Sequence, residues 1–197
     1  MKDFCHQIGL DRQREREQSL GFSRSSAQKA VQAATKHYQT WLHDIGANDG
    51  TAPKTLADYY VAKHNDAPVY QLLKGYSRAV DKGDISPLVG FKRYNEVAQE
   101  IEDKLIGVTT STGVTIESFA THFIDRTIGQ TSTAHKGMRL GTDIEHVLDA
   151  LTNPVDVGKK RTMKDGDIRQ KFTGKNANVV ISTRDKKLIQ ANPRRAR

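Results

Sequence analysis

The sequence predicts an α+β protein in which helices pack on a small antiparallel sheet. Apolar residues recur at three- and four-residue spacing through most of the chain before residue 152, which is typical of amphipathic helices. Near the C-terminus, "ANVVIS" at 177–182 and "KLIQAN" at 187–192 are short apolar runs joined by "TRDK", a pattern typical of an antiparallel hairpin. Helices followed by short antiparallel strands make an α+β architecture, which we expect over residues 53–193.

The N-terminal quarter predicts a helical extension. Residues 11–19 are all charged or polar and indicate an exposed helix, and a second helix is expected from Ser23, capped by Ser23 or Ser25. "DIGANDGTAP" at 44–53 is rich in residues that break helices, so we expect two domains, an extension over 1–52 and a main domain over 53–197. Two interpretations exist for Tyr38, Trp41 and Leu42: they pack on the main domain, which is favoured, or they dock on another protein.

The middle of the chain predicts further helices with recognisable ends. Thr55 with Asp58 forms a capping-box pattern, and Asp66 precedes an apolar stripe that ends near Val80. Helices are also expected over 92–104, 117–129 and 142–151, the last with a capping box of Thr142 and Glu145 and an end at "NP". The β-branched stretch 107–116 predicts a hairpin.

The charge is uneven along the chain. The net charge is +8, yet residues 159–197 hold 13 Lys and Arg against 3 acidic residues. This imbalance favours contact with a polyanion such as a nucleic acid, because binding of phosphates releases their counterions. The alternative is a solvated basic tail. The single Cys5 excludes an internal disulfide framework, and no apolar run reaches the length of a membrane span or of a secretory signal.

Several catalytic motifs are missing from the sequence: a Gly-rich phosphate loop, His-Glu-x-x-His, paired metal-binding carboxylates and Gly-x-Ser-x-Gly. We therefore expect no metal and no cofactor. RNA cleavage needs only a proton acceptor, a proton donor and a cation, since the nucleophile is the substrate's own 2′-hydroxyl.

The stretch "SFATHFIDRT" at 118–127 carries the candidate catalytic pair. His122 and Arg126 are one helical turn apart, on a face that we expect to be polar and to include Asp125. Histidine is the usual proton carrier near neutral pH, and arginine matches phosphate geometry. The alternative is a pair of solvated side chains. His135 and His146 are weaker candidates.

The basic C-terminal region is expected to supply the remaining groups. We predict Thr183 as a hydrogen-bonding partner at the catalytic site. The expected nucleic-acid contacts are Arg169, Lys171, Lys175, Arg184 and Lys186.

The chain resembles the C-terminal region of phage minor head proteins of the Mu F type. There a nuclease-like domain of the barnase/EndoU/colicin/RelE (BECR) superfamily is often appended. The matching elements are a His and an Arg on a helix (His122, Arg126), "NP" after the next helix (Asn153-Pro154), and a terminal hairpin ending in "LIQANP" (188–193). The resemblance covers about residues 53–193.

This resemblance implies a metal-independent ribonuclease of the toxin type, with helices packed on a short antiparallel sheet. It further implies RNA as the substrate, often tRNA, an immunity protein as inhibitor, and association with phage head or portal proteins. Such a protein is virion-associated or delivered to the bacterial cytoplasm. Two alternatives remain open. One is a minor capsid component that binds nucleic acid through its basic C-terminus without cleaving it, and the other is a nucleotide-modifying enzyme.

Overall fold

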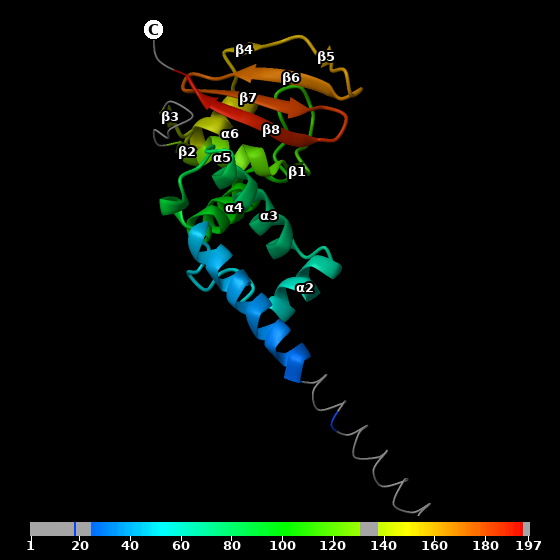
Figure 1. The fold of residues 1–197 in the computed structure, drawn as a ribbon. Helices are drawn as coiled ribbons and strands as arrows, with labels where there is room; N and C mark the ends of the chain where they lie inside the picture. Colours follow the sequence, from blue (N-terminus) through cyan, green and yellow to red (C-terminus); the bar gives the residue numbers. More distant parts are fainter. Residues whose placement is uncertain (1–17, 19–24, 131–137, 195–197) are drawn as a thin grey trace, which may run out of the picture.

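The computed structural model describes residues 25–130 and 138–194, together with Gln18, and confirms the α+β fold class (Figure 1). The helices are 25–44, α2 (Leu56–His64), α3 (Pro68–Asp81), the 3₁₀ turn η1 (Pro87–Val89), α4 (Phe91–Leu105), α5 (Thr121–Ile128) and α6 (Ile144–Thr152). The strands are β1 (Ser118–Phe119), β2 (Gly129–Gln130), β3 (Arg139–Leu140), β4 (Asp156–Val157), β5 (Arg161–Thr162), β6 (Ile168–Thr173), β7 (Ala177–Ser182) and β8 (Lys187–Pro193).

The main sheet has the strand order β1-β8-β7-β6-β4, and β5 also pairs with β6. The β7–β8 hairpin confirms the prediction for 177–192, with a register irregularity between Val180 and Ile181. The pairing of β6 with β7 adds a third long strand that the sequence patterns did not indicate. β1 runs parallel to β8, whereas β2 and β3 form a separate two-stranded ribbon.

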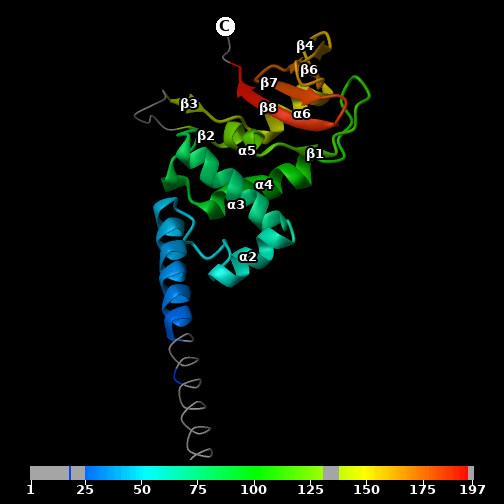
Figure 2. The same cartoon turned by 45° about the vertical axis from the view of Figure 1, so that its right-hand side comes forward.

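Helices α5 and α6 cover one face of the sheet (Figures 1 and 2). The strands send Phe172, Val179, Ile181 and Leu188 to this face, and all four are completely buried. Because side chains alternate along a strand, Arg169 and Lys171 of β6 lie on the opposite face, away from the helices. The sheet therefore has one apolar face and one face carrying cations.

The second half of the helix at 25–44 packs on the rest of the protein. Tyr38 and Leu42 are each 6% exposed and belong to the same apolar core as residues of α3 and α4, and the Tyr38 hydroxyl donates to the carbonyl of Pro53. The Trp41 ring contacts the Tyr38 ring at a tilt and the Tyr59 ring edge to face, and the two tyrosine rings also contact each other. The favoured interpretation of this apolar stripe is thus confirmed. The earlier part of the helix projects away from the body (Figure 2), and the division at residues 52 and 53 stays a prediction.

The loop at 45–53 supplies the cap of helix α4. The N-cap of α4 is Gly90, which has no side chain to offer. Instead, the Asp49 carboxylate accepts from the backbone N–H of Lys92 at 2.6 Å, and the Gly46 carbonyl accepts from the N–H of Phe91 at 2.9 Å. A loop predicted as a chain break therefore ties the first helix to α4.

Two predicted helix caps are wrong, and one is confirmed. Thr55 and Asp58 form the predicted capping box. Asp66 does not cap α3, because it adopts φ 49° and its carboxylate accepts from the Gln71 side chain; Ala67 is the N-cap. Asp143 caps α6 in place of Thr142, whose backbone N–H is bonded to the Thr127 carbonyl and whose side chain is buried.

Two further boundaries differ from expectation around α5. The stretch 107–116 folds back on itself, but Thr109 and Thr115 form only an isolated antiparallel bridge within it. The helix expected from residue 117 begins at Thr121, because Ser118 and Phe119 pair with Lys187 and Leu188 of β8. Long-range strand pairing thus overrides the local helical pattern there.

Among the described helices, none combines the length and the apolar character that crossing a membrane requires.

Candidate functional site

Helix α5 holds three side chains in one hydrogen-bonded series. The Nε–H of Arg126 donates to Nε2 of His122 at 3.0 Å. On the other side of the ring, Nδ1 of His122 lies 3.3 Å from Oδ2 of Asp125. The Asp125 side chain is 7% exposed and that of His122 is 42% exposed, so the series runs from the interior to the surface.

These contacts specify one tautomer of His122. Because Arg126 can only donate, Nε2 must present its lone pair to Arg126. The proton of a neutral ring is then on Nδ1 and faces the Asp125 carboxylate. A carboxylate in this position orients the imidazole and stabilises the imidazolium that forms when Nε2 takes a second proton.

Asp125 does not lie on a solvated face, and that part of the polar-face prediction is wrong. Its Oδ1 is 3.3 Å from the hydroxyl of Tyr94, which is fully buried in α4 and also lies 3.2 Å from the carbonyl of Thr121. Burial, and then the charge of Asp125, raise the pKa of Tyr94 far above its ordinary value. Tyr94 is therefore a neutral donor that compensates the buried carboxylate.

A second guanidinium reaches the same place from β3. Nη2 of Arg139 donates to the backbone carbonyl of Asp125 at 3.0 Å, while Nε of Arg139 is buried and has no hydrogen-bond partner among the described residues. Burial, and then the charge of Arg126, lower the pKa of Arg139, against the opposing effect of Asp84 and Asp125. Arg126 and Arg139 are thus two cations that repel one another at one site.

Two glycines allow Arg139 to approach α5. A Cβ on Gly129, which has φ 88°, would lie 2.4 Å from the backbone nitrogen of Gly141. A Cβ on Gly141 would lie 2.4 Å from the carbonyl oxygen of Thr127. The β2–β3 ribbon therefore packs against the end of α5 at a distance that only glycine permits.

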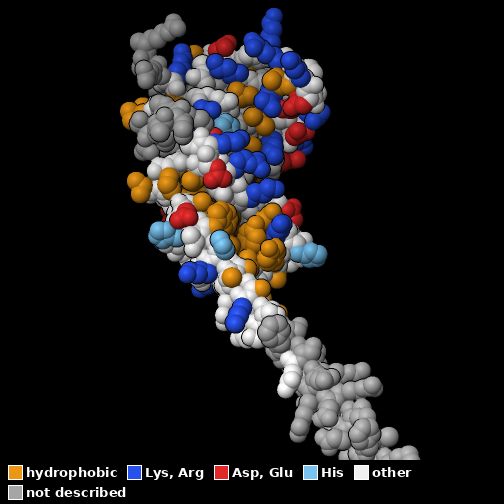
Figure 3. Space-filling view, viewed as in Figure 1, with side chains coloured by type: hydrophobic (Ala, Val, Ile, Leu, Met, Phe, Trp, Pro, Cys, Tyr) orange, Lys and Arg blue, Asp and Glu red, His pale blue; other side chains and the backbone are white. Residues whose placement is uncertain are grey.

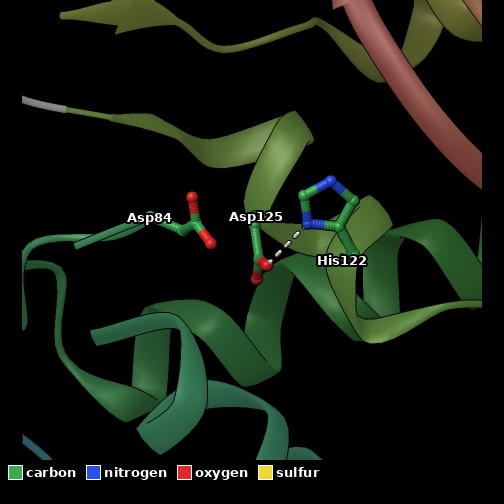
Figure 4. A group of neighbouring side chains, drawn as sticks. All are labelled: Asp84, His122 and Asp125. Carbon is green, nitrogen blue, oxygen red and sulfur yellow. Dashed lines mark hydrogen bonds and ion pairs between the residues drawn. The ribbon is translucent and has the colours of Figure 1, made fainter. Parts of the chain in front are cut away.

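Asp84, in the loop after α3, lies near His122 and Asp125 and forms a cluster with them. One ligand atom each from Asp84, His122 and Asp125 lies within 4.8 Å of those of the other two, and Figure 4 shows the Asp84 carboxylate directed toward this pair. The loop is held by the Gln130 side chain, which donates to the carbonyl of Gly83 at 2.5 Å. These three residues are the group in the described chain with the donor types and spacing to hold a metal ion.

The predicted contacts of the basic region do not join this cluster. None of the hydrogen bonds between described residues links Thr183 to His122; the Thr183 hydroxyl donates to the carbonyl of Ile168 instead. Arg169 forms an ion pair with Asp167 at 2.7 Å, and Arg184 and Lys186 pair with Asp185 and Glu117. Lys171 and Lys175 are exposed, and no ion pair among described residues engages them.

His135 and His146 are the other two histidine candidates. His146 is exposed on α6, and His135 lies outside the described residues.

Sequence reasoning missed Asp84, Tyr94 and Arg139 as members of the site. Tyr94 follows the apolar stripe of its helix, which indicates only a core position. Asp84 lies in a loop and Arg139 in the two-residue strand β3, and no local sequence pattern marks either position. The sequence did indicate the pair of His122 and Arg126, because these residues are four apart on one helix.

Comparisons of the chain with protein-family models, with curated proteins and with solved structures each gave no match. Any assignment of function therefore depends on the chemistry of the cluster and on the distribution of charge.

Proposed function

We propose that this protein is a metal-independent ribonuclease that cleaves RNA through the substrate's 2′-hydroxyl. The observation that carries the proposal is the series Asp125–His122–Arg126, in which a buried carboxylate orients a half-exposed imidazole beside a guanidinium. This set of groups matches the requirements of the reaction: a proton carrier, a group that stabilises its charged form, and a fixed cation for the phosphate.

In the proposed reaction, the scissile phosphate draws Arg126 away from the ring, since a phosphate oxygen is a stronger acceptor than a neutral imidazole. Nε2 of His122 is then free to accept the proton of the 2′-hydroxyl. The 2′-oxygen forms a bond to phosphorus and the bond from phosphorus to the 5′-oxygen breaks. The leaving 5′-oxygen takes up a proton from the His122 imidazolium, which returns the ring to its neutral form. The products are a 2′,3′-cyclic phosphate and a 5′-hydroxyl end.

Arg139 is the second cation of the proposed site. An anion bound between the two guanidiniums relieves the repulsion between Arg139 and Arg126. The phosphorane-like transition state carries more negative charge than the ground state, so the two cations stabilise the transition state more strongly. The same pair would also bind a product phosphate.

RNA is further favoured by the charge on the sheet half of the molecule. Figure 3 shows many Lys and Arg side chains over this half. The described residues 156–194 include exposed cations that no ion pair between described residues neutralises: Lys159, Lys160, Arg161, Lys164, Lys171 and Lys175. Since Lys171 lies on the face away from α5, an RNA that contacts both regions must pass around an edge of the sheet. This geometry requires a folded or extended RNA rather than a dinucleotide.

The resemblance to BECR domains of phage minor head proteins extends the proposal. It suggests a toxin that acts on tRNA in the bacterial cytoplasm, with an immunity protein that masks the site, and it suggests association with phage head or portal proteins. A masking protein for this surface would carry acidic side chains to meet the exposed lysines.

The test is induced expression in bacteria of the wild type beside His122→Ala and Arg126→Ala, with total RNA separated on a denaturing gel. His146→Ala is the matched control, because His146 is exposed on α6 and takes no part in the proposed reaction. We expect growth arrest and discrete RNA fragments with the wild type and the control, and neither with the two site variants. Harmless expression of all four folded proteins would contradict the proposal.

A second function is favoured by the separation of the lysine-bearing sheet face from His122: a minor capsid component that binds nucleic acid and cleaves nothing. It predicts salt-sensitive binding to duplex DNA and no effect of His122→Ala on that binding. Cleavage of RNA by the purified wild type, but not by His122→Ala, would exclude it.

A further inference from the structure

We infer that Asp84, His122 and Asp125 form a binding site for a divalent transition-metal ion such as Zn²⁺. The bound ion competes with the hydrogen bond from Arg126 to His122. The three residues come from two segments, the loop after α3 and helix α5. Each offers one ligand atom, and these atoms lie within 4.8 Å of one another (Figure 4). Asp125 is buried, which limits the competing hydration of its carboxylate.

The distance between His122 and Asp125 suits two ligands of one ion. Hydrogen bonds between a charged and a polar partner are usually about 2.7–2.9 Å long, whereas Nδ1 and Oδ2 are 3.3 Å apart. Ligand bonds of about 2.0–2.2 Å in a tetrahedral arrangement separate neighbouring ligand atoms by about 3.3–3.6 Å. The pair therefore needs little movement to coordinate an ion.

The donor set and its surroundings select the kind of cation. One imidazole nitrogen and two carboxylates suit Zn²⁺, whereas Mg²⁺ and Ca²⁺ prefer oxygen ligands alone. Arg126 and Arg139 lie beside the site and oppose any further positive charge. Their repulsion weakens the binding of an ion that is held by charge alone more than the binding of an ion that forms a strong bond to the His122 nitrogen. Three protein ligands also leave a fourth position open.

Coordination at Nδ1 reverses the tautomer of His122. Nδ1 must give up its proton to bind the ion, and a neutral ring then carries its proton on Nε2. Nε2 is thereby converted from an acceptor to a donor, so the hydrogen bond from Arg126 is lost. The ion would also remove the lone pair that accepts the 2′-hydroxyl proton, and zinc would inhibit cleavage. This last step rests on the proposed function, whereas the binding itself does not.

Calorimetric titration of the full chain with ZnCl₂ tests the binding, in a Cys5→Ser background so that the thiol cannot compete. We expect one ion per chain, weaker binding by about tenfold or more in Asp84→Asn and His122→Ala, and no heat with MgCl₂. Asp81→Asn is the matched control, since Asp81 is an exposed carboxylate at the end of α3, and it should bind as the parent does. Arg139→Gln should bind zinc more tightly, because it removes an opposing charge.

Equal zinc affinity in the parent, Asp84→Asn and His122→Ala, with each variant folded by circular dichroism, would overturn the site. Absence of binding by the parent would overturn it too, whatever the activity on RNA.

RNA cleavage with and without ZnCl₂ tests the competition. Zinc should reduce the rate at least about tenfold in the parent, EDTA should restore it, and the ratio should approach one in Asp84→Asn. A rate that rises with zinc would overturn the competition. Zinc binding by a protein that cleaves no RNA under either condition would support the site and contradict the proposed function, so the two failures are distinguishable.

Discussion

The Nε–H of Arg126 donates to Nε2 of His122 across one turn of helix α5, at 3.0 Å. A guanidinium in this position makes the imidazole unavailable as a base until another acceptor attracts the arginine. Under the proposed function, this relationship would link phosphate binding to proton transfer, because the arginine that contacts the phosphate would also release the lone pair of His122.

Asp125→Asn should slow RNA cleavage by about 10²-fold or more, because the neutral amide no longer stabilises the His122 imidazolium. The fold should persist, since the Tyr94 hydroxyl can still donate to the amide oxygen. The measurement is the cleavage rate of a fluorescent RNA, with melting temperatures recorded in parallel. Asp103→Asn, an exposed carboxylate on α4, is the control. An unchanged rate in Asp125→Asn would remove this carboxylate from the mechanism.

Gly75→Ala should destabilise the protein by about 1–3 kcal/mol through overpacking between α3 and α5. The added Cβ would lie 2.7 Å from Cγ2 and 2.8 Å from Cβ of Thr121, so the start of α5 must move. Urea denaturation measures the change in the free energy of unfolding. Thr121→Ser in the Gly75→Ala background removes the nearer of these atoms and should recover part of the loss. Equal stability of Gly75→Ala and the wild type would show that the helices can separate at no cost.

Asp49→Ala should lower the free energy of unfolding by about 1 kcal/mol at pH 7, because α4 loses its cap. Partial burial alone would raise the pKa of Asp49, but the backbone hydrogen bonds from Lys92 and Thr51 outweigh it and lower the pKa. A carboxyl group whose pKa is lower in the folded state stabilises the fold at pH values above its unfolded pKa, about 3.9. This stabilisation is lost as the pH falls through the pKa of the folded state. The difference between variant and wild type should thus shrink below about pH 4.

Asp44→Ala is the control for Asp49, since Asp44 is exposed at the end of the preceding helix and caps nothing in α4. A difference between Asp49→Ala and wild type that stays constant from pH 7 to pH 3 would contradict the role of the charged carboxylate.

Lys171→Glu should weaken RNA binding and reduce its salt dependence. For single-stranded RNA, the slope of log K against log salt concentration should become shallower by about 0.7 for each phosphate contact that is lost. Fluorescence anisotropy at several salt concentrations measures both quantities. Lys74→Glu is the control, because Lys74 is an exposed lysine of equal charge on helix α3. If both variants lose the same affinity, net charge rather than the sheet face controls binding.

The sequence by itself determined the parts of the fold that depend on neighbours along the chain. The β7–β8 hairpin, the capping box of Thr55 and Asp58, the helix at Phe91–Leu105 and the spacing of His122 and Arg126 on one helix all appeared as predicted. These features are local, because a turn, a cap or an i, i+4 pair is encoded within a few residues.

Only the tertiary structure decided which polar residues are buried together. Asp125 is as polar in the sequence as Arg126, yet its carboxylate turns inward because the Tyr94 hydroxyl and the His122 ring provide its partners. Asp84 and Arg139 join His122 from positions 38 and 17 residues away, through a loop and a ribbon that carry no periodic pattern. Burial of a charged group depends on compensation by distant donors, and no local pattern records where those donors will be.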